Sequence, residues 1–589
     1  MSSGSLGSPS IRSLFFRFLP YAAAEKRGVA VSVALVLAEP LAVTLLMWSF
    51  KRLIDDVLVA GRTDLLTGVC AIYLLAAMAK IAIDYFMLRV ETNVLESINL
   101  ALRSDLYGHA LSLSPGSLES HAPGDVLTRL QTDTTRAEFL IFSGPMAILA
   151  DGVAAVVYVG FLFLLSWQLA LVALIALPTI GFCVSILARH VRKAAYLSRT
   201  ANSQWMSLAE ERLEASQIVH AFDALRRELA AFQIRCGKVR HLEVTAQVLQ
   251  ARQSAVVEAV LAIAGFAVFG LGARLISQGS LTVGGLVAFV GAANSLFAPV
   301  RALAKSAGRI QYAAAGAERV AALLDRRSLV AEPAAPLSIQ NPQGRAEYRD
   351  VHFSYPGGDE VLRGLSIIIE PGETVAVVGA SGSGKTSLVR LLLRQYDCNA
   401  GAVLLDGIDV KALSFSALHD MVSPVFQDAQ ILNGTIEKNI RYGAPQAKQS
   451  EIAQAAKAAA VDIFADAKGR LATPVGPRGS RLSGGQRQRI GVARAIAHGA
   501  PILVLDEATA GVDSQTEELI QDALDQVAGQ RTLLIVAHRL STVRRANRVV
   551  VMEGGRIIEA GRPADLLAKP NSRCRELFAA QLVHNEAAE

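Results

Sequence analysis

The chain has 589 residues, of which 52% belong to the hydrophobic set AVILMFWYC and only 19% are charged. Soluble proteins carry about 25% charged residues, so this composition excludes a disordered chain and an ordinary soluble protein. The net charge is +6, but no basic stripe is interleaved with aromatic residues, so we expect no nucleic-acid partner. The five cysteines lie far apart and show no metal-ligand or disulfide pattern.

Six apolar stretches in the N-terminal half approach or exceed the ~20 residues that a helix needs to cross a membrane. A lipid interior offers no hydrogen-bond partners, so unbroken apolar runs of this length are expected as helices. The first stretch is too long, and lacks the small-residue cleavage pattern, for a signal peptide. The predicted spans are residues 28–50, 65–88, 141–165, 168–190, 254–275 and 281–303.

Lysine and arginine residues set the predicted orientation, because they are enriched on the cytoplasmic side of membrane proteins. They are frequent in the N-terminal tail and in the connection 190–253, and scarce in the connections on the other side. Both termini of this multi-pass integral membrane protein are therefore expected in the cytoplasm. The connections 89–140 and 191–253 have a helix-forming composition, so long cytosolic extensions of the membrane helices are expected, with a break near Pro123.

Five charged residues lie not at the ends of the predicted spans but well inside them, where charges usually face the interior of a helix bundle or an aqueous cavity. They are therefore candidates for lining a substrate path. The alternative is structural, because Lys80 and Asp84 lie one helical turn apart and can neutralise each other, and the others can lie close to the membrane surface. The five residues are Glu39, Lys80, Asp84, Asp151 and Glu258.

The sequence pattern changes after residue 325. Residues 326–345 contain three prolines and little periodicity, which is typical of a linker. In residues 346–589, short apolar runs alternate with helical stretches, which predicts the buried parallel strands of an α/β domain. We therefore expect a transmembrane domain over 1–325, a linker over 326–345 and an α/β domain over 346–589.

A glycine-rich loop follows the first apolar run of the α/β domain and matches the GxxxxGK[ST] pattern of a phosphate-binding P-loop. Its glycines let backbone N–H groups surround phosphate oxygens, and the following helix adds its positive end. Lys385 is expected to reach the β- and γ-phosphates of ATP, and Thr386 to bind Mg²⁺. The nucleotide-binding residues assigned here are Gly379, Ser381, Gly382, Ser383, Gly384, Lys385, Thr386 and Ser387.

A second apolar run, residues 502–505, delivers two carboxylates at its C-terminal end. Asp506 is expected to hold Mg²⁺, and Glu507 to polarise the attacking water. Phosphoryl transfer depends mainly on positioning and charge stabilisation. These two acids and Lys385 therefore form a sufficient minimal set for ATP hydrolysis.

Between these two motifs, residues 482–486 read Leu-Ser-Gly-Gly-Gln, and with this pentapeptide the chain resembles a subunit of the ABC transporter superfamily. The resemblance covers nearly the whole chain, because six spans followed by one P-loop ATPase domain are similar to the exporter-type half-transporters. That group includes bacterial lipid flippases and multidrug exporters. Further residues in matching motifs are Tyr355, Gln427, Ser483, Gly484, Gly485, Gln486, Asp513 and His538.

The resemblance implies a role for each of these residues. Tyr355 would stack on adenine, and His538 would touch the γ-phosphate. Gln427 would sense the γ-phosphate, contact the membrane domain and serve as a metal ligand. In the family, residues Ser483 to Gln486 of one subunit close over the ATP held by the P-loop of the other, and Asp513 is counted among the nucleotide-binding residues. The implied assembly is a homodimer with two ATP sites, and a heterodimer is the alternative.

The implied function is ATP-driven export or flipping of a small amphipathic or lipid-like substrate by alternating access. The implied location is the bacterial inner membrane, where the protein contacts membrane lipids. The alternatives are an importer on the same fold and an ATP-gated membrane regulator. Two positions depart from the family's pattern: Pro477 stands where an acid usually contacts the coupling helices, and Ala510 stands where serine is usual. Neither change removes a phosphate or metal ligand, so ATP hydrolysis is expected to survive.

Overall fold

A computed structural model of the chain describes residues 9–118, 123–465, 470–507, 513–579 and 581. The chain divides into two compact units. The first contains Met1–Gly108 and Pro123–Asp325, and the second contains His109–Ala122 and Arg326–Glu589. The short excursion His109–Ala122 therefore groups with the C-terminal unit, as does the segment that the sequence suggests is a linker.

Helices build the first unit, and six helical segments of the described chain are long and apolar enough to cross a membrane. The predicted number of spans is thus confirmed. Each predicted span lies within one segment, apart from two residues before the last. The main helices are α2 (Lys26–Arg52), α3 (Leu66–Ser112), α7 (Ser143–Leu165), α8 (Trp167–Glu214), α10 (Leu225–Ser277) and α11 (Val283–Leu324). The shorter elements are α1 (Ile11–Ala24), η1 (Leu53–Val59), η2 (Thr63–Leu65), α5 (Pro123–Thr128), η3 (Arg129–Asp133), α6 (Thr134–Ile141) and α9 (Ser216–Ala221).

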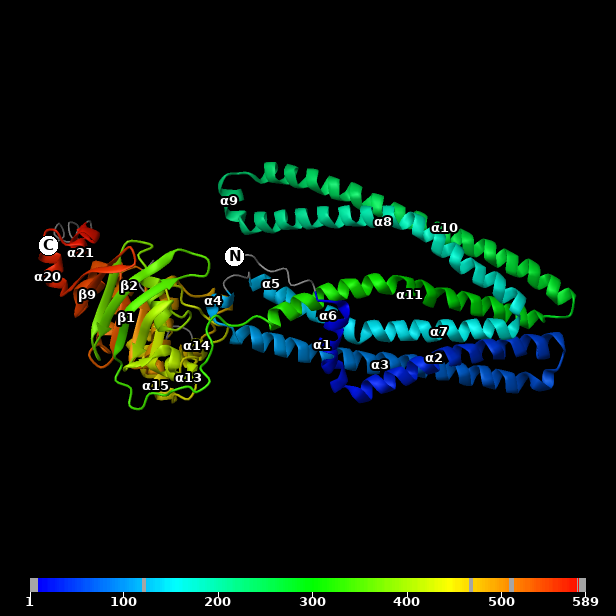
Figure 1. The fold of residues 1–589 in the computed structure, drawn as a ribbon, viewed down its shortest axis with the longest axis horizontal. Helices are drawn as coiled ribbons and strands as arrows, with labels where there is room; N and C mark the ends of the chain where they lie inside the picture. The colour runs from blue at the N-terminus through cyan, green and yellow to red at the C-terminus, as the bar shows by residue number, and fades with distance from the viewer. Residues whose placement is uncertain (1–8, 119–122, 466–469, 508–512, 580, 582–589) are drawn as a thin grey trace. The chain divides into compact units, whose positions relative to one another are not determined.

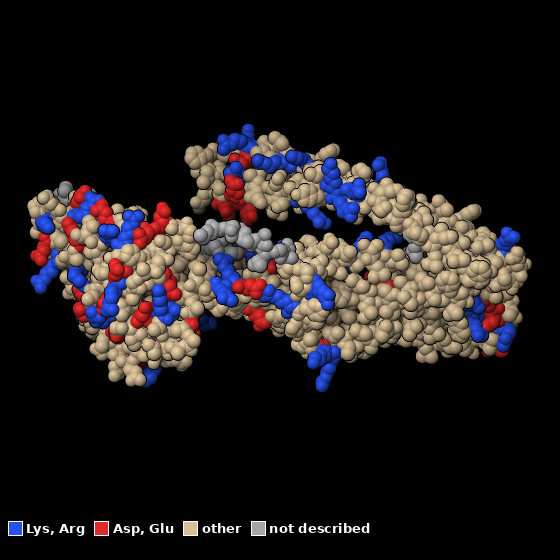
Figure 2. Space-filling model, viewed as in Figure 1, with Lys and Arg blue, Asp and Glu red and all other residues tan. Residues whose placement is uncertain are grey.

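The three longest helices are far longer than a bilayer is thick. The α3, α8 and α10 helices contain 47, 48 and 53 residues. At 1.5 Å per residue, α10 is roughly 80 Å long, against about 30 Å of hydrocarbon in a membrane. The expected extensions beyond the membrane are therefore present. Exposed Lys and Arg side chains gather on α8 and α10 toward α9 (Figure 2), and they include Arg192, Lys193, Arg199, Arg226, Arg227, Arg235, Lys238 and Arg240.

The α8 and α10 helices pack along each other and are joined through α9 at one end (Figure 1). At the opposite end, a buried apolar cluster shared with α7 and α11 holds the pair. Leu169 of α8 and Leu275 of α10 belong to this cluster. Toward α9, large apolar side chains are exposed instead, among them Leu213, Ile218 and Phe222.

An ion pair with a buried carboxylate connects the segment after the α5 helix to α11. Asp133 is fully buried, and its carboxylate accepts hydrogen bonds from Nε and Nη2 of Arg319 at 2.7 and 2.6 Å. Arg136 donates a third hydrogen bond to it, at 2.8 Å. Because a buried carboxylate without these donors would be strongly destabilising, this contact fixes α11 against η3 and α6.

The second unit contains two sheets. An antiparallel sheet has the strand order β2-β1-β4-β5, and a larger sheet has the order β10-β9-β3-β8-β7-β6. In the larger sheet only β10 runs antiparallel to its neighbour. The strands are β1 (Ala346–Ser354), β2 (Glu360–Ile369), β3 (Thr374–Gly379), β4 (Ala400–Leu405), β5 (Ile408–Asp409), β6 (Val422–Val425), β7 (Ile502–Asp506), β8 (Thr532–Val536), β9 (Arg548–Glu553) and β10 (Arg556–Gly561).

Helices surround these sheets. Four of them carry residues of the candidate site or lie beside it: α4 (Pro115–Leu118), α12 (Lys385–Leu392), α17 (Gly484–His498) and α18 (Ser514–Asp525). The others are α13 (Phe415–Met421), α14 (Ile436–Arg441), α15 (Gln449–Ala458), α16 (Asp462–Ala465), α19 (Leu540–Arg545), α20 (Pro563–Ala568) and α21 (Arg573–Leu577), with the short turns η4 (Val410–Ala412), η6 (Arg470–Ala472) and η7 (Pro477–Gly479).

The central strands are apolar because both of their faces are covered. Along β3, Ala376 and Val378 belong to one apolar core, and Val375 and Val377 belong to the other. Such strands read as continuous apolar runs rather than as alternating ones, as the sequence predicts. Their shared direction places the C-terminal ends of β3, β7 and β8 at one edge of the sheet, where the candidate site forms.

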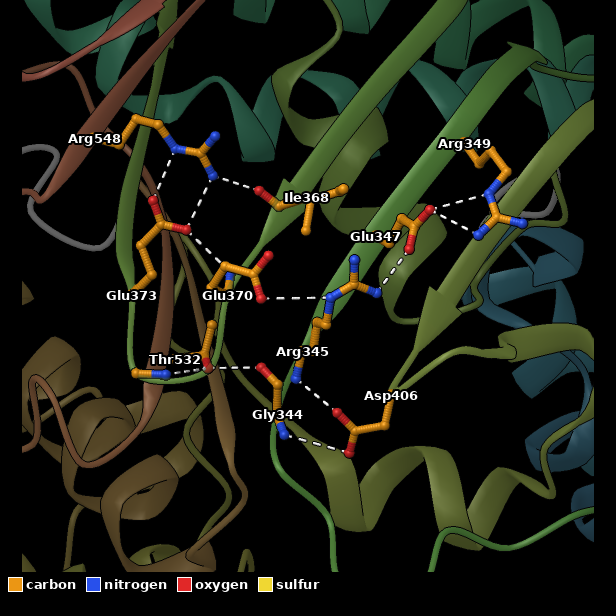
Figure 3. A network of polar contacts seen from close by, with 11 residues as sticks. Gly344, Arg345, Glu347, Arg349, Ile368, Glu370, Glu373, Asp406, Thr532 and Arg548 are labelled. Atoms are coloured by element: carbon orange, nitrogen blue, oxygen red, sulfur yellow. Dashed lines mark hydrogen bonds and ion pairs between the residues drawn. The ribbon is translucent and has the colours of Figure 1, made fainter.

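At the opposite end of these strands, a polar network joins the first residues of the α/β fold to the sheet (Figure 3). Arg548 forms two contacts with the Glu373 carboxylate, at 2.8 and 3.0 Å. Arg345 bridges Glu347, at 2.8 Å, and Glu370, at 3.5 Å. The hydroxyl of Thr532 donates to the Gly344 carbonyl at 2.6 Å. The chain is therefore anchored where it enters the sheet, away from the candidate site.

Candidate functional site

The glycine-rich loop connects the end of β3 to the start of α12. Gly382 and Gly384 have φ values of +80° and +101°, which favour glycine, and a Cβ on Gly384 would come within 2.7 Å of Leu362. Gly379 lies so close to the β9 backbone that a Cβ would approach the Met552 carbonyl oxygen to 2.2 Å. The loop therefore adopts its tight path only with glycine at these positions.

Lys385 is the first residue of α12, and its side chain is buried in the loop. Its ammonium donates hydrogen bonds to the carbonyl oxygens of Gly379 and Ala380, at 2.8 and 3.0 Å. Burial lowers the pKa of Lys385, and the nearby charges of Glu507 and Asp506 oppose this effect. The ammonium is thus the cationic centre of the loop and has acidic groups close by.

Asp506 ends β7 and is almost fully buried. Burial and then the charge of Glu507 raise its pKa above the ordinary aspartate value, while Lys385 and Arg390 oppose the shift. Its Oδ1 atom is buried and has no hydrogen-bond partner. An unsatisfied buried carboxylate oxygen beside the P-loop, with the exposed Thr386 next to Lys385, fits a binding site for a cation with oxygen ligands.

Glu507 has both carboxylate oxygens engaged. Oε2 accepts a hydrogen bond from Nε2 of Gln427 at 2.9 Å, and Oε1 lies 2.6 Å from Nε2 of His538. The φ of Glu507 is +50°, a strained value for a residue other than glycine. The structure therefore brings together the three residues that the sequence assigns to catalysis.

The Tyr355 ring lies against two other aromatic rings. Its centroid is 4.8 Å from that of Phe353 and 5.1 Å from that of Tyr396, both in edge-to-face geometry. Its hydroxyl lies 2.9 Å from that of Ser387 in α12. The residue expected to stack on adenine is thus tied directly to the helix of the P-loop.

The signature pentapeptide forms the start of α17. Ser483 caps the helix: its Oγ accepts from the backbone N–H of Gln486 at 3.2 Å, and its own N–H donates to the Gln486 side chain at 3.0 Å. Ser483 and Gly484 are exposed. Within the described part of the chain, no hydrogen bond or ion pair joins Ser483–Gln486 to the P-loop. One copy of the chain thus presents this helix end outward.

Asp513 begins α18 and caps it by accepting from the N–H and the hydroxyl of Thr516, both at 2.9 Å. Thr516 also lies beside the signature, because a Cβ on Gly485 would come within 2.6 Å of its methyl group. Asp513 and the signature therefore share one surface of the domain.

Of the two departures from the family pattern, only Pro477 lies within the described residues. Pro477 is exposed at the first position of a short 3₁₀ turn, which the buried Val475 precedes. Ala510 lies outside the described residues.

The sequence did not predict two buried residues that contact residues of the site. Gln488 is buried on α17 and donates from its side-chain amide to the carbonyl of Gln427. Tyr396 is buried against Tyr355. Gln488 stands two residues after the signature, but nothing in the sequence pairs either residue with its distant partner.

Among the charges inside the predicted spans, Lys80 and Asp84 form the expected ion pair, at 2.5 Å. Glu39 interacts electrostatically with both, so three of the five candidates form one cluster on α2 and α3. Asp151 of α7 interacts with Arg309 of α11. Glu258 is exposed on α10.

A basic stripe on α11 was not singled out from the sequence. Arg301, Lys305 and Arg309 follow one another at intervals of four residues, so they lie on one face of the helix. All three are exposed, and the described residues form no ion pair within 4 Å with them. The repeated spacing is the signal that could have revealed this stripe.

Comparison with known proteins agrees with this arrangement. Residues 29–300 match the family described as the ABC transporter transmembrane region, and residues 362–510 match the family described as ABC transporter. A protein of Thiobacillus denitrificans named ATP-dependent lipid A-core flippase is 34% identical over 587 residues, which cover 98% of this chain and all of that protein. A Bacillus subtilis protein whose name refers to multidrug export is 31% identical over 96% of this chain and 99% of its own length.

Among solved structures, a bacterial Atm1-family ABC exporter with ATP bound superimposes with a TM-score of 0.77. The sequences are 26% identical, and the match covers 95% of this chain and 99% of the exporter chain. The neighbouring structure and the named relatives favour an exporter or flippase over an importer.

Proposed function

The chain belongs to the ABC transporter family, as one half-transporter with a membrane unit and a nucleotide-binding unit, and we propose that it flips or exports an anionic amphipathic lipid. The observation that carries the proposal is the exposed basic stripe Arg301, Lys305 and Arg309 on α11, which lies at the end of the last predicted apolar span that we expect on the cytosolic side. Cations there suit a negatively charged head group, while the apolar helices suit acyl chains. The T. denitrificans relative carries the name of a lipid flippase.

We assign the chemical step to the cluster around Glu507. Its carboxylate accepts a proton from the attacking water, while Gln427 and His538 hold the carboxylate in position. Lys385 and the backbone N–H groups of the P-loop stabilise the charge on the phosphates. Thr386, Asp506 and Gln427 would hold Mg²⁺, which would neutralise charge on the β- and γ-phosphate oxygens.

The exposed signature helix supports a two-chain site. Ser483, Gly484 and the N-terminal end of α17 form an anion-binding surface that is not joined to the P-loop of the same chain. Two copies related by a two-fold axis would bring each signature to the other's nucleotide and form two equivalent sites. We therefore infer a homodimer, with both chain termini on the cytoplasmic side of a bacterial inner membrane.

Leaflet transfer of labelled lipids in proteoliposomes tests the proposal. The wild type and Glu507→Gln would be compared with an anionic phospholipid and a zwitterionic one, and ATPase activity would be read on the same vesicles. We expect ATP-dependent transfer by the wild type alone, faster for the anionic lipid. ATPase activity without transfer of either lipid would overturn the lipid assignment and leave the hydrolytic assignment intact.

A triple variant links the result to the stripe. Arg301→Gln, Lys305→Gln and Arg309→Gln together remove three positive charges while keeping long polar side chains. We expect the preference for the anionic lipid to disappear while basal ATPase activity persists. An unchanged preference would show that other groups select the head group.

A further inference from the structure

The side chain of Tyr396 connects Tyr355, the proposed adenine platform, to the short helix α4. Tyr396 is buried, with 6% of its surface exposed. One part of its ring faces Tyr355 in edge-to-face geometry, with centroids 5.1 Å apart and planes at 90°. Its phenolic end faces Gly116 of α4. Tyr396 therefore lies between the nucleotide platform and the excursion at the end of α3.

The fit of Tyr396 against α4 depends on Gly116. A Cβ at Gly116 would come within 2.3 Å of Cζ and 2.6 Å of the hydroxyl oxygen of Tyr396. Real Cβ atoms do not approach other atoms so closely, so any larger residue would displace either the ring or the helix. The glycine thus lets the ring press directly on the α4 backbone.

Hydrogen bonds hold α4 on its other flank. The backbone N–H of Ser114 donates to Oγ of Ser328 at 3.0 Å, and the N–H of Leu329 donates to Oγ of Ser117 at 2.8 Å. His109 lies 3.0 Å from the carbonyl of Arg326. These contacts join α4 to the chain that enters the nucleotide-binding unit. The α4 helix is therefore held both by Tyr396 and by residues 326–329.

The platform itself has two further restraints. The Tyr355 hydroxyl lies 2.9 Å from that of Ser387 in the P-loop helix, and the Arg390 guanidinium lies 5.8 Å from the ring centroid. A base stacked on Tyr355 would fix the ring between these contacts and the base. The edge of Tyr396 that abuts the ring would then be fixed as well.

We propose that Tyr396 is a positioning residue that transmits occupancy of the Tyr355 base platform to Gly116 of α4. The inference rests on the proposed role of Tyr355 as the adenine platform. Because α4 follows α3 within a few residues, the contact supplies a direct route from the base of the nucleotide to a membrane helix. It acts in addition to contacts made by the phosphates.

Amide hydrogen exchange of residues 109–118 tests the relay in the full-length protein reconstituted in nanodiscs. The parent protein is Glu507→Gln, which keeps ATP bound. ATP is expected to slow exchange in this segment by roughly two- to tenfold, the range of an edge-to-face aromatic contact. In Tyr396→Ala, ATP should slow it no more than twofold at equal site occupancy, whereas Tyr396→Phe should retain the effect.

Nucleotide binding is measured on the same samples with a fluorescent ATP analogue. Equal slowing of exchange in Tyr396→Ala and the parent at equal occupancy would overturn the relay. Loss of binding in the parent would instead overturn the proposed nucleotide function. Gly116→Ala gives a second test, because it should alter the exchange of residues 109–118 without ATP and reduce the ATP effect. An unchanged ATP effect in Gly116→Ala would also contradict the relay.

Discussion

The side-chain amide of Gln427 donates a hydrogen bond to the Glu507 carboxylate, with 2.9 Å between Nε2 and Oε2. His538 occupies the second oxygen of the same carboxylate, at 2.6 Å. Each oxygen of the Glu507 carboxylate thus has one close polar neighbour and keeps a second lone pair that can accept a hydrogen bond from water. Gln427 and His538 therefore fix the orientation of the Glu507 carboxylate.

The Glu507→Gln variant should lose ATP hydrolysis while keeping ATP bound. An amide cannot accept the proton of the attacking water, and loss of a general base typically costs 10²–10⁴-fold in rate. Steady-state phosphate release and binding of a fluorescent ATP analogue are the measurements. The matched control is Glu518→Gln, which changes an exposed glutamate on α18. Hydrolysis at the wild-type rate in Glu507→Gln would contradict the assignment.

The Lys385→Ala variant should weaken nucleotide binding itself. A hydrogen bond to a charged group contributes about 1.5–3 kcal/mol, so the Kd for ATP should rise by roughly ten- to a hundredfold. Isothermal titration of the detergent-solubilised protein measures this change. The exposed Lys438 provides the control substitution, Lys438→Ala. Equal affinities for ATP in the Lys385 variant and the wild type would show that Lys385 does not bind the phosphates.

The Asp506→Asn variant should show opposite effects on activity and on stability. Burial and the charge of Glu507 raise the pKa of Asp506, so the folded protein binds its proton more tightly than the unfolded chain does. Ionised Asp506 therefore costs stability at neutral pH, and the cost disappears as the pH falls through the raised pKa. The variant should have a higher Tm than the wild type at neutral pH, without nucleotide.

That difference in Tm should vanish in acid, below the ordinary aspartate pKa. ATPase activity should fall by about 10²-fold or more, because a carboxylate that would hold Mg²⁺ beside the phosphates is lost. Thermal unfolding as a function of pH, with ATPase assays in parallel, makes the comparison. A lower Tm for Asp506→Asn at neutral pH would show that the ionised carboxylate is stabilised by contacts outside the described set.

The Arg319→Ala variant should destabilise the membrane unit. It leaves the fully buried Asp133 with Arg136 as its remaining donor among the described residues. The Arg319 side chain is 43% exposed, so the cost should be smaller than the about 3–5 kcal/mol of breaking a fully buried ion pair. We expect a lower Tm and a raised sensitivity to proteolysis near α6. The double variant Arg319→Ala with Asp133→Asn should recover part of the loss. A single variant as stable as the wild type would show that the pair is replaceable by solvent.

The Pro477→Glu variant tests the departure from the family pattern. Pro477 is exposed at the first position of its turn, so a glutamate there should leave the fold and basal ATPase activity intact. If the missing acid weakens coupling, substrate should stimulate ATP hydrolysis more strongly in Pro477→Glu than in the wild type. Equal stimulation would sink the idea that this position limits coupling.

Much of the fold follows from the sequence because its determinants are local. Long apolar runs must become membrane helices, and the buried strands β3, β7 and β8 read as uninterrupted apolar stretches. The catalytic residues are also marked locally, since Asp506 and Glu507 end one such strand and the glycine-rich loop follows another. Their roles in binding and hydrolysis stay predictions until the variants above are measured.

The contacts that the sequence did not predict join residues far apart along the chain. Asp133 and Arg319 are separated by 186 positions, and Gly116 meets Tyr396 only through tertiary packing. Neither pair lies in a repeated spacing or a motif. The composition of residues 326–345 did not reveal that this segment would group with the nucleotide-binding unit. Such grouping depends on tertiary contacts with residues that are distant in the sequence.

The exposed apolar residues near α9 bear on the fate of newly made chains. Leu213, Ile218 and Phe222 have 75%, 62% and 78% of their surfaces exposed, on the part of the hairpin that extends beyond the apolar span. If two copies pair as we propose, a chain that has inserted into the membrane but has not yet paired would display these side chains to chaperones and proteases, which recognise such surfaces. The cellular amount of this protein would then be governed by the rate of pairing relative to degradation, rather than by synthesis alone.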